Sequence, residues 1–198
     1  MGINIDNKFK RDGFKVIAGV DEAGRGAWAG PLVAAAVIMP NKIVSGITDS
    51  KKISERKREQ LFPLITKQAL CWAVVSVNQN EIDTLGVHEA NKLALSYAIT
   101  HLDVVPDIVL VDGFKIEHFV PTEQVIGGDA KSYNIGAASI IAKVVRDRLM
   151  RRFDMFDGRF VFAKHKGYGT KYHEQQLEIY KPHLIHRKSF APIQRFGI

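Results

Sequence analysis

The sequence is poor in cysteine and has no long apolar run. Cys71 is the only cysteine among 198 residues, so no disulfide can form within the chain, and a reducing compartment such as the cytoplasm is expected. The longest wholly apolar stretch, residues 32–39, is far shorter than the roughly 20 residues that span a bilayer. No signal peptide or lipid anchor is recognisable. These absences argue against a secreted disulfide-rich domain and against a membrane protein.

Basic residues outnumber acidic ones and gather near the C-terminus. The net charge is +7, with 28 Lys and Arg against 21 Asp and Glu. Residues 159–198 hold eight of the basic residues against Glu174 and Glu178. Such a surplus favours a polyanionic partner such as nucleic acid, although it also serves solubility. We expect a single domain over residues 1–198, in which residues 159–198 form a basic extension that binds the substrate.

Short apolar runs alternate with longer segments of helical spacing. This alternation is typical of an α/β fold, and a mixed sheet is expected because the first two runs are close enough to pair antiparallel. The third and fourth runs are joined by a helical stretch, as in a parallel crossover. Helices are expected over residues 55–69 and 89–102 and from Asn134 onward, with Ser54 and Asn134 as N-caps. The expected strands are residues 15–20, 32–39, 71–77, 108–111 and 124–126.

The third helix has apolar residues at every fourth position. This spacing predicts a stripe that faces the core, with the charged residues of the helix nearer to solvent. Trp72, which lies in an apolar run, is also expected in the core, and Asp147 is expected to form an ion pair. The stripe consists of Ile141, Val145, Leu149 and Phe153, and the solvent side of Lys143, Arg146 and Arg151.

Two adjacent carboxylates, Asp21 and Glu22, stand between an apolar run and a loop that contains Gly24, Arg25 and Gly26. Side chains of a regular strand alternate between its faces, so we expect the strand to end before Asp21 and to become irregular there. The glycines permit that irregularity, which would bring both acids to one site. Taken alone, the stretch is also compatible with a solvated turn, because Asp and Gly are common turn residues.

Asp112 and Asp129 repeat this arrangement. Asp112 ends an apolar run and precedes Gly113, and Asp129 follows Gly127 and Gly128. Clustered carboxylates repel one another unless a divalent cation balances them, and oxygen ligands of this kind suit Mg²⁺ or Mn²⁺. Two such ions can catalyse phosphodiester hydrolysis. Together the acidic positions indicate a metal-dependent nuclease more strongly than any one of them alone.

Six short segments follow one another in a recognisable order. They are GVDEAGRG at 19–26, TDSKK at 48–52, VDG at 111–113, GDAKS at 128–132, AASIIAKV at 137–144 and HKGYGT at 165–170. In this order the segments resemble bacterial ribonuclease HII, and the resemblance extends over residues 16–190. Arg25 distinguishes this family from the related type III enzymes, which carry lysine there and an additional N-terminal domain that we do not expect in this chain.

The resemblance implies a ribonuclease-H-like fold: a mixed five-stranded sheet flanked by helices, with a small helical C-terminal extension. It implies an endonuclease that hydrolyses the RNA strand of RNA–DNA hybrids and cuts 5′ of single ribonucleotides in duplex DNA, as in ribonucleotide removal during repair and replication. The products would carry 5′-phosphate and 3′-hydroxyl ends, and the enzyme is expected to be a monomer. Four catalytic carboxylates that hold two Mg²⁺ or Mn²⁺ ions match Asp21, Glu22, Asp112 and Asp129.

The resemblance also implies a set of substrate-binding residues. The glycine-rich loop would contact the ribose 2′-hydroxyl through its backbone, and Arg25 would hold an adjacent phosphate. Tyr168 would pack on the nucleotide that follows the ribose. Ser50 and Lys51 would hold backbone phosphates, which position a duplex without reading its sequence. The complete set is Gly24, Arg25, Gly26, Ser50, Lys51 and Tyr168, and the basic extension adds Lys164, Lys166, Lys171 and Arg187 as expected phosphate contacts.

Three positions depart from the family pattern: Ala27 stands where proline is common, Gly127 where lysine is common, and Gly136 where a larger residue is usual. Substrate affinity is the property that the change at Gly127 affects most directly. The histidines of the extension lack zinc-ligand spacing, so His183 and His186 are expected at the surface or near phosphates.

Two other functions fit parts of the same pattern. A non-catalytic binder of hybrids or duplexes would keep the basic extension and the glycine-rich loop but would not need the carboxylates. Another two-metal nuclease or recombinase with the same fold would cut DNA, and its loop would lack a reader of the 2′-hydroxyl. Cleavage of duplexes that differ only in their ribonucleotides separates all three.

Overall fold

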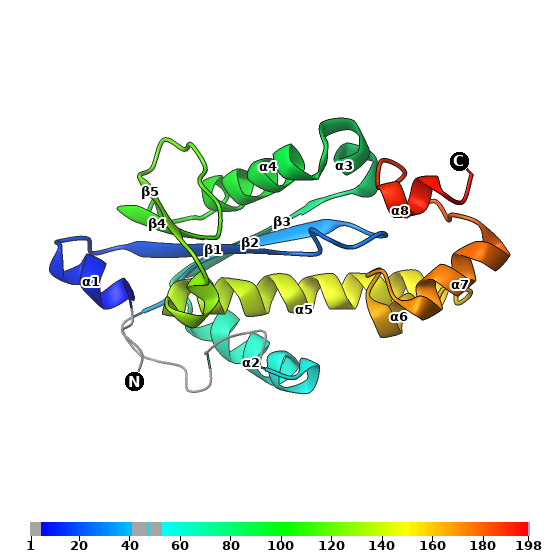
Figure 1. Ribbon diagram of the computed structural model, residues 1–198. Helices are drawn as coiled ribbons and strands as arrows, with labels where there is room; N and C mark the ends of the chain where they lie inside the picture. Colours follow the sequence, from blue (N-terminus) through cyan, green and yellow to red (C-terminus); the bar gives the residue numbers. More distant parts are fainter. Residues whose placement is uncertain (1–4, 41–46, 48–52, 198) are drawn as a thin grey trace.

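The computed structural model describes residues 5–40, 47 and 53–197, and in this part of the chain a five-stranded sheet lies between two layers of helices (Figure 1). The strand order is β3-β2-β1-β4-β5. β1 pairs antiparallel with β2 and parallel with β4, which confirms the prediction of a mixed sheet. The strands are β1 (Ile17–Ala23), β2 (Leu32–Ile38), β3 (Cys71–Val77), β4 (Ile108–Asp112) and β5 (Thr122–Val125).

Helices α3 and α4 cover one face of the sheet, and α2 and α5 cover the other (Figure 1). The N-cap predicted for α2 is confirmed, since Oγ of Ser54 accepts a hydrogen bond from the amide of Lys57. The helices of the two layers are α2 (Glu55–Gln68), α3 (Gln79–Leu85), α4 (Val87–Thr100) and α5 (Tyr133–Phe156), and α1 (Ile5–Arg11) and the short 3-10 helix η2 (Gly128–Ala130) lie near the start of α5.

β2 is buried along its whole length, which explains its uninterrupted apolar sequence. Alternate residues face the two helical layers and so join two separate apolar clusters. Both faces of this strand are therefore covered by helices, although β1 is the middle strand of the sheet. Leu32, Ala34, Ala36 and Ile38 pack with the α4 layer, and Ala35 and Val37 pack with the α5 layer.

One sequence-based expectation about the strands is wrong, and another is confirmed. The first strand does not end at Val20 but continues regularly through Asp21 and Glu22 to Ala23, because these residues pair with β2. The predicted parallel crossover is confirmed, since β3 and β4 run in the same direction; β2 and β1 lie between them, so the helical connection crosses two strands.

The N-cap of α5 is Ser132, not Asn134: Oγ of Ser132 accepts a hydrogen bond from the amide of Ile135. Asn134 instead ties the helix to other elements. Its side-chain oxygen accepts from the amide of Met39, and its amide nitrogen donates to Asp6. Asp6, from α1, is buried at this helix start, where a carboxylate is favoured by the helix dipole.

α5 buries a different face from the predicted one. Ile141 is buried, but Val145, Leu149 and Phe153 keep part of their surface exposed, whereas Arg146 is only 1% exposed. The periodic pattern failed because the second half of α5 packs against the C-terminal extension as well as the sheet, and Met150 belongs to the extension's apolar cluster. Arg146 lies inside because its guanidinium group reaches backbone carbonyls there.

Trp72 is 39% exposed, which contradicts its expected place in the core. It lies on β3, one of the two edge strands of the sheet, and among the described aromatic side chains its ring pairs only with that of Phe62, in a T-shaped arrangement. Asp147 forms the predicted ion pair, with Arg58 at 3.2 Å.

The C-terminal extension is helical, as expected, and has an apolar cluster of its own. Trp28 and Ala29 of the loop before β2 join that cluster, and Ala29 forms a β-bridge with His186. His186 is fully buried rather than at the surface, and its Nε2 lies 2.9 Å from Nε2 of His173. The extension contains α6 (Phe162–His165), α7 (Lys171–Tyr180) and α8 (Ala191–Gln194). None of the described helices is long and apolar enough to cross a bilayer.

Candidate active site

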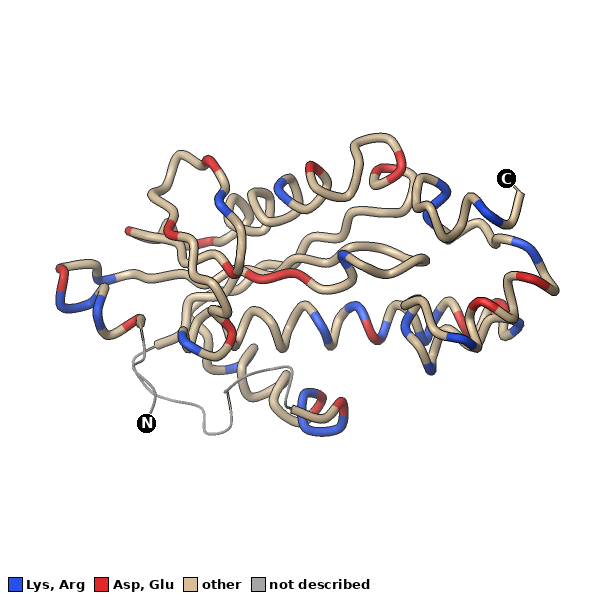
Figure 2. The backbone as a smooth tube through the Cα atoms, viewed as in Figure 1, with Lys and Arg blue, Asp and Glu red and all other residues tan. Residues whose placement is uncertain are grey.

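A cavity of about 540 Å³ opens where β1 and β4 stop pairing. Their register runs up to Val20 opposite Val111, so beyond this point β1 is paired only with β2. Asp21 and Glu22 follow on β1 and Asp112 follows on β4, and all three line the cavity. Figure 2 shows this acidic stretch of β1 in the middle of the molecule, beside the basic residues of α5. The remaining lining residues are Ala23, Gly24, Arg25, Gly26, Gly113, Phe114, Ile126, Gly127, Lys143 and Tyr168.

The two adjacent acids reach one cavity without any break in the strand. Asp21 interacts with α5, on one face of the sheet, and Glu22 points toward the opposite face, as alternation requires. Both still border the cavity because it lies along the unpaired edge of β1. The expected irregularity was therefore unnecessary, since the sheet itself opens at this position.

Asp21 is held on three sides. Its Oδ1 accepts from the amide of Glu22 at 2.7 Å, Ser139 supplies a side-chain hydrogen bond, and Nζ of Lys143 lies 3.8 Å from Oδ2. Lys143 also donates to Ser139, one turn earlier on α5. Burial, opposed by Lys143 and reinforced by the negative charge of Asp112, raises the pKa of Asp21 to about 6. The site therefore disfavours the ionised form of this carboxylate.

Glu22 is the acid with the least satisfied side chain. Its Oε1 lies 3.5 Å from Nη1 of Arg25, whereas its Oε2 is buried and has no hydrogen-bond partner among the described residues. Burial and the neighbouring charge of Asp21 raise the pKa of Glu22 to about 7. A buried carboxylate oxygen without a donor is costly unless a cation approaches it.

The other two acids are Asp112, at the end of β4, and Asp129, in η2 just before α5. Oδ1 of Asp112 accepts from the amide of Gly128 at 2.6 Å, which fastens η2 to the end of β4. Asp129 follows Gly128 and is 4% exposed. It is not among the residues that line the described cavity, so the structure brings three of the four predicted acids to the cavity and places the fourth next to a residue bonded to one of them.

The donor set fits a hard divalent cation. It offers carboxylate oxygens at one opening, one of them unpartnered, and raised carboxyl pKa values that added positive charge would relieve. Within residues 5–40, 47 and 53–197, no three His, Cys, Asp or Glu side chains are already arranged as a metal cluster. The carboxylates bond instead to Lys143 and to backbone amides.

The glycine-rich loop forms the rim of the cavity. Gly24 has a φ of +91°, and a methyl group there would lie 1.8 Å from Nε of Arg146, so only glycine fits. Arg25 places its guanidinium group over the ring of Phe114, 4.8 Å from the ring centre. Nothing lies within 4 Å of a methyl group built on Gly26, which leaves room for a ligand at its backbone. The predicted phosphate contacts Ser50 and Lys51 lie outside the described residues.

Tyr168 stands at the same cavity and is 42% exposed. The guanidinium group of Arg146 lies 5.2 Å from its ring centre, on the protein side. The neighbouring Gly167 packs so closely that a methyl group there would lie 2.3 Å from the carbonyl oxygen of Ala29. Because Gly167 has no side chain, the segment that carries Tyr168 packs directly on the loop before β2.

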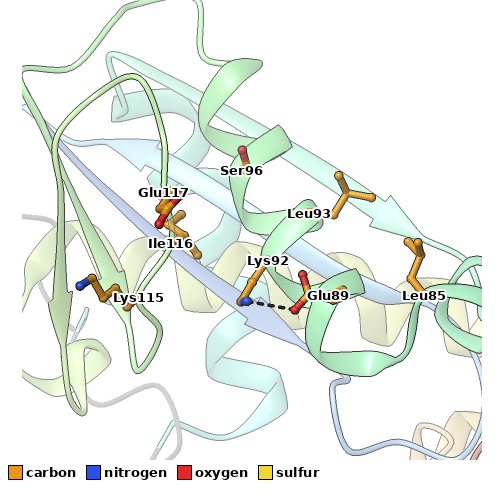
Figure 3. Close-up of a pocket in the computed structure, with 8 residues that line it drawn as sticks. All are labelled: Leu85, Glu89, Lys92, Leu93, Ser96, Lys115, Ile116 and Glu117. Carbon is orange, nitrogen blue, oxygen red and sulfur yellow. Dashed lines mark hydrogen bonds and ion pairs between the residues drawn. The ribbon is translucent and has the colours of Figure 1, made fainter.

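A larger cavity, about 690 Å³, lies between α4 and the segment after β4 (Figure 3). In Figure 3, Lys92 turns toward Glu89, and the two side chains form an ion pair at 2.9 Å. The charges of Lys92 and Glu89 therefore neutralise each other in this cavity, whereas negative charge is concentrated around Asp21 in the other cavity. Size alone thus selects the wrong cavity, and the chemistry of the lining selects the smaller one.

Comparison with known proteins decides the family. The family model of ribonuclease HII matches residues 18–193. The chain belongs to the ribonuclease HII family. It is 47% identical to ribonuclease HII of Bacillus velezensis over 187 residues, which cover 94% of this chain and 73% of that protein. This membership makes the protein an endoribonuclease that hydrolyses the RNA strand of RNA–DNA hybrids.

Solved structures support the same fold. Ribonuclease H2 from Pyrococcus horikoshii superposes with a TM-score of 0.77 at 25% identity, covering 92% of this chain and 97% of that one. Bst ribonuclease HIII in complex with Mn²⁺ gives a TM-score of 0.76 at 16% identity and covers 91% of this chain and 68% of that one. The ribonuclease-H-like architecture expected from the motifs is confirmed.

The positions that depart from the ribonuclease HII pattern have local structural reasons. Gly127 has a φ of +62°, a conformation that glycine adopts freely. A methyl group on Gly136 would lie 3.1 Å from the carbonyl oxygen of Asp129, so this glycine lets α5 approach η2 closely. Ala27 is buried and donates its amide to the carbonyl of Gly24, closing the turn of the loop.

Three basic residues make contacts that the local sequence pattern does not predict. Lys143, expected nearer to solvent, contacts Asp21, and its spacing of four residues from Ser139 within a matching segment is the signal that both reach the same strand. Arg187, expected to bind phosphate, is fully buried instead, where it donates to the carbonyls of Arg25 and Gly30. Lys166 is also engaged, since it pairs with Glu55 at 3.3 Å.

Proposed function

We propose that this ribonuclease HII, besides hydrolysing the RNA strand of hybrids, cuts 5′ of single ribonucleotides embedded in duplex DNA, as a step of ribonucleotide removal in repair and replication. The products carry 5′-phosphate and 3′-hydroxyl ends. The observation that supports this most is the meeting of three carboxylates, the glycine-rich loop and exposed Tyr168 at one cavity.

In this proposal Asp21, Glu22, Asp112 and Asp129 hold two Mg²⁺ or Mn²⁺ ions. The unpartnered Oε2 of Glu22 and the raised pKa values of Asp21 and Glu22 support a cationic ligand, and a relative of the same fold was solved with Mn²⁺. Bound ions of this class activate water and stabilise the charge of a phosphodiester transition state. Lys143 and Ser139 fix the orientation of Asp21 from the α5 side.

The loop and Tyr168 recognise the ribonucleotide. The free space at Gly26 lets the backbone approach the 2′-hydroxyl, the group that distinguishes RNA from DNA. Arg25, released from Glu22 and Phe114, holds a phosphate through charge-assisted hydrogen bonds. The Tyr168 ring packs on the following nucleotide, and Ser50 and Lys51 bind backbone phosphates.

The basic extension, residues 159–198, supplies further phosphate contacts through exposed lysines such as Lys164 and Lys171. The protein acts as a monomer in the cytoplasm. Light scattering during size-exclusion chromatography, with and without duplex, tests the oligomeric state.

The decisive assay uses three duplexes of one sequence, which contain one ribonucleotide, a run of ribonucleotides or none, incubated with protein and Mg²⁺ or Mn²⁺. The proposal predicts cleavage of the first two and no cleavage of the all-DNA duplex. Binding without cleavage would identify a non-catalytic binder, and cleavage of the all-DNA duplex would identify a DNA nuclease.

A further inference from the structure

Two arginines are buried beneath the glycine-rich loop. Arg146, from α5, is 1% exposed, and Arg187, from the extension, is 0% exposed. Among the residues that the structure describes, neither forms an ion pair with a carboxylate. Burial, together with the positive charge of Arg146, lowers the pKa of Arg187 to about 9. Burial of unpaired charge costs several kcal/mol per ion, so this arrangement needs a reason.

The two guanidinium groups donate to backbone carbonyls of a single segment. Arg187 reaches the carbonyl of Arg25 at 2.8 Å and that of Gly30 at 3.0 Å. Arg146 reaches the carbonyl of Ala29 at 3.2 Å, and its Nε donates to that of Pro31 at 2.9 Å. Both guanidinium groups therefore bond the same segment, residues 24–31. Arg187 links the carbonyl of Arg25, near the start of the segment, to that of Gly30, near its end.

The same arginines contact the two elements that border the cavity. A methyl group on Gly24 would collide with Nε of Arg146, so the loop backbone rests directly on this side chain. The ring of Tyr168 lies over the guanidinium group of Arg146. Nη2 of Arg187 is buried without a hydrogen-bond partner among the described residues, which a side chain kept for packing alone would avoid.

We propose that Arg146 and Arg187 are positioning residues of this ribonuclease, which hold the backbone of residues 24–31 and Tyr168 in the conformation that reads the ribonucleotide. The inference rests on the proposed function of that loop. A planar fork that spans two carbonyls is required, because an ammonium group is a point donor on a flexible stem. The two buried positive charges also favour a phosphate against the outer side of the loop.

The test compares Arg146→Lys, Arg187→Lys and Arg187→Met with the wild type. Arg58→Lys is the matched control, since Arg58 also joins a backbone carbonyl, that of Ile53, to a second element but does not bond residues 24–31. Each protein is assayed for kcat and KM on a duplex with one ribonucleotide. Hydrogen exchange of the backbone amides of residues 24–30 is measured on the free proteins at a temperature where all remain folded.

Because small misplacements near the reacting atoms lower kcat by up to about 100-fold, we expect Arg187→Met to lose about 10- to 100-fold in kcat with KM changed less than about threefold. Both lysine variants lose about tenfold, since they keep the charge but not the fork. Amide exchange in residues 24–30 accelerates in all three. Arg58→Lys keeps kcat within about twofold of the wild type even where its melting temperature falls equally.

Loss of kcat in Arg58→Lys equal to that in Arg187→Lys, or unchanged kcat in Arg187→Met, would overturn the inference. So would unchanged amide exchange in residues 24–30. Failure of the proposed function is recognised separately, because the wild type would then not cleave the duplex, while the exchange measurement on free protein would still report whether the arginines hold the loop.

Discussion

Nζ of Lys143 lies 3.8 Å from Oδ2 of Asp21, linking the middle of α5 to the strand that carries the acidic pair. Arg25 stands in the corresponding relation to Glu22, at 3.5 Å. Each of the adjacent carboxylates thus faces one protein cation, yet both keep raised pKa values because burial outweighs these charges. The site holds more negative charge than its own cations balance.

Replacement of Lys143 by Met should raise the pKa of Asp21 further above about 6, because the charge that opposes the burial effect is removed. Carbon-13 NMR titration of the Asp21 carboxyl group in the metal-free protein measures this directly. Lys115→Met, on the segment after β4, is the control and should leave the titration unchanged. An Asp21 titration identical in Lys143→Met and the wild type would contradict the ion pair.

The acidic pair should also make the metal-free protein less stable as pH rises. The folded-state pKa values, about 6 for Asp21 and about 7 for Glu22, exceed the ordinary values of 3.8 and 4.5, so the folded state binds protons more readily than the unfolded state. The two acids do not destabilise the folded state below about pH 4, and their destabilising effect is complete above about pH 7. It lowers the free energy of unfolding by about 2 to 5 kcal/mol in total. Chemical unfolding of the wild type and Asp21→Asn at a series of pH values measures it.

Histidines act in the opposite direction over an overlapping range. Burial lowers the pKa of His173 to about 4 and that of His186 to about 3, so their contribution to stability is lost as pH falls below about 6.5. Because both proteins contain these histidines, their contribution cancels in the difference between the unfolding free energies of the wild type and Asp21→Asn. That difference should grow in favour of the variant from about pH 4 to about pH 7, and a flat difference would refute the raised pKa of Asp21.

Gly24→Ala should destabilise the protein by about 1 to 3 kcal/mol, because the added methyl group combines a positive φ with a collision against a buried, hydrogen-bonded arginine. Gly26→Ala is the matched control, two residues away in the same loop, where nothing lies within 4 Å of the added group. Urea unfolding compares them. Equal free energies of unfolding for the two variants would show that the loop does not rest on Arg146.

Tyr168→Ala should lower kcat/KM on a single embedded ribonucleotide by about 5- to 150-fold, the equivalent of one lost stacking contact of roughly 1–3 kcal/mol. Tyr168→Phe keeps the ring and should lose little. An all-RNA strand paired with DNA should respond differently to Tyr168→Ala, since it presents a hydroxyl where the ring would meet a deoxyribose. Equal, small effects on both substrates would mean that Tyr168 is structural.

Elements of the fold could be predicted from the sequence where neighbouring residues alone determine the local structure. The buried run of β2 identified a strand because burial on both faces leaves no polar positions, and Ser54 identified a helix start because its hydroxyl caps the next turn. The end of β1 was misplaced because pairing with β2, a long-range contact, extends the strand through Asp21 and Glu22.

Parts of the site depend on contacts that no local pattern contains. The acids of β1 and β4 could be recognised by type and by resemblance, but their meeting depends on where β1 and β4 stop pairing. The buried arginines looked like surface residues because charge usually means exposure. Arg187 lies 162 residues from Arg25, whose carbonyl it bonds, and only the folded chain brings them together.

The most direct test of the account is Asp21→Asn, which keeps the shape of the side chain and removes its charge. We expect cleavage of a duplex with one ribonucleotide to fall at saturating Mg²⁺ to the level of the reaction without protein, while affinity for the duplex stays within about threefold, because an amide cannot help to hold two cations. Cleavage by Asp21→Asn within about tenfold of the wild type at saturating Mg²⁺ would contradict the carboxylate cluster as the catalytic centre.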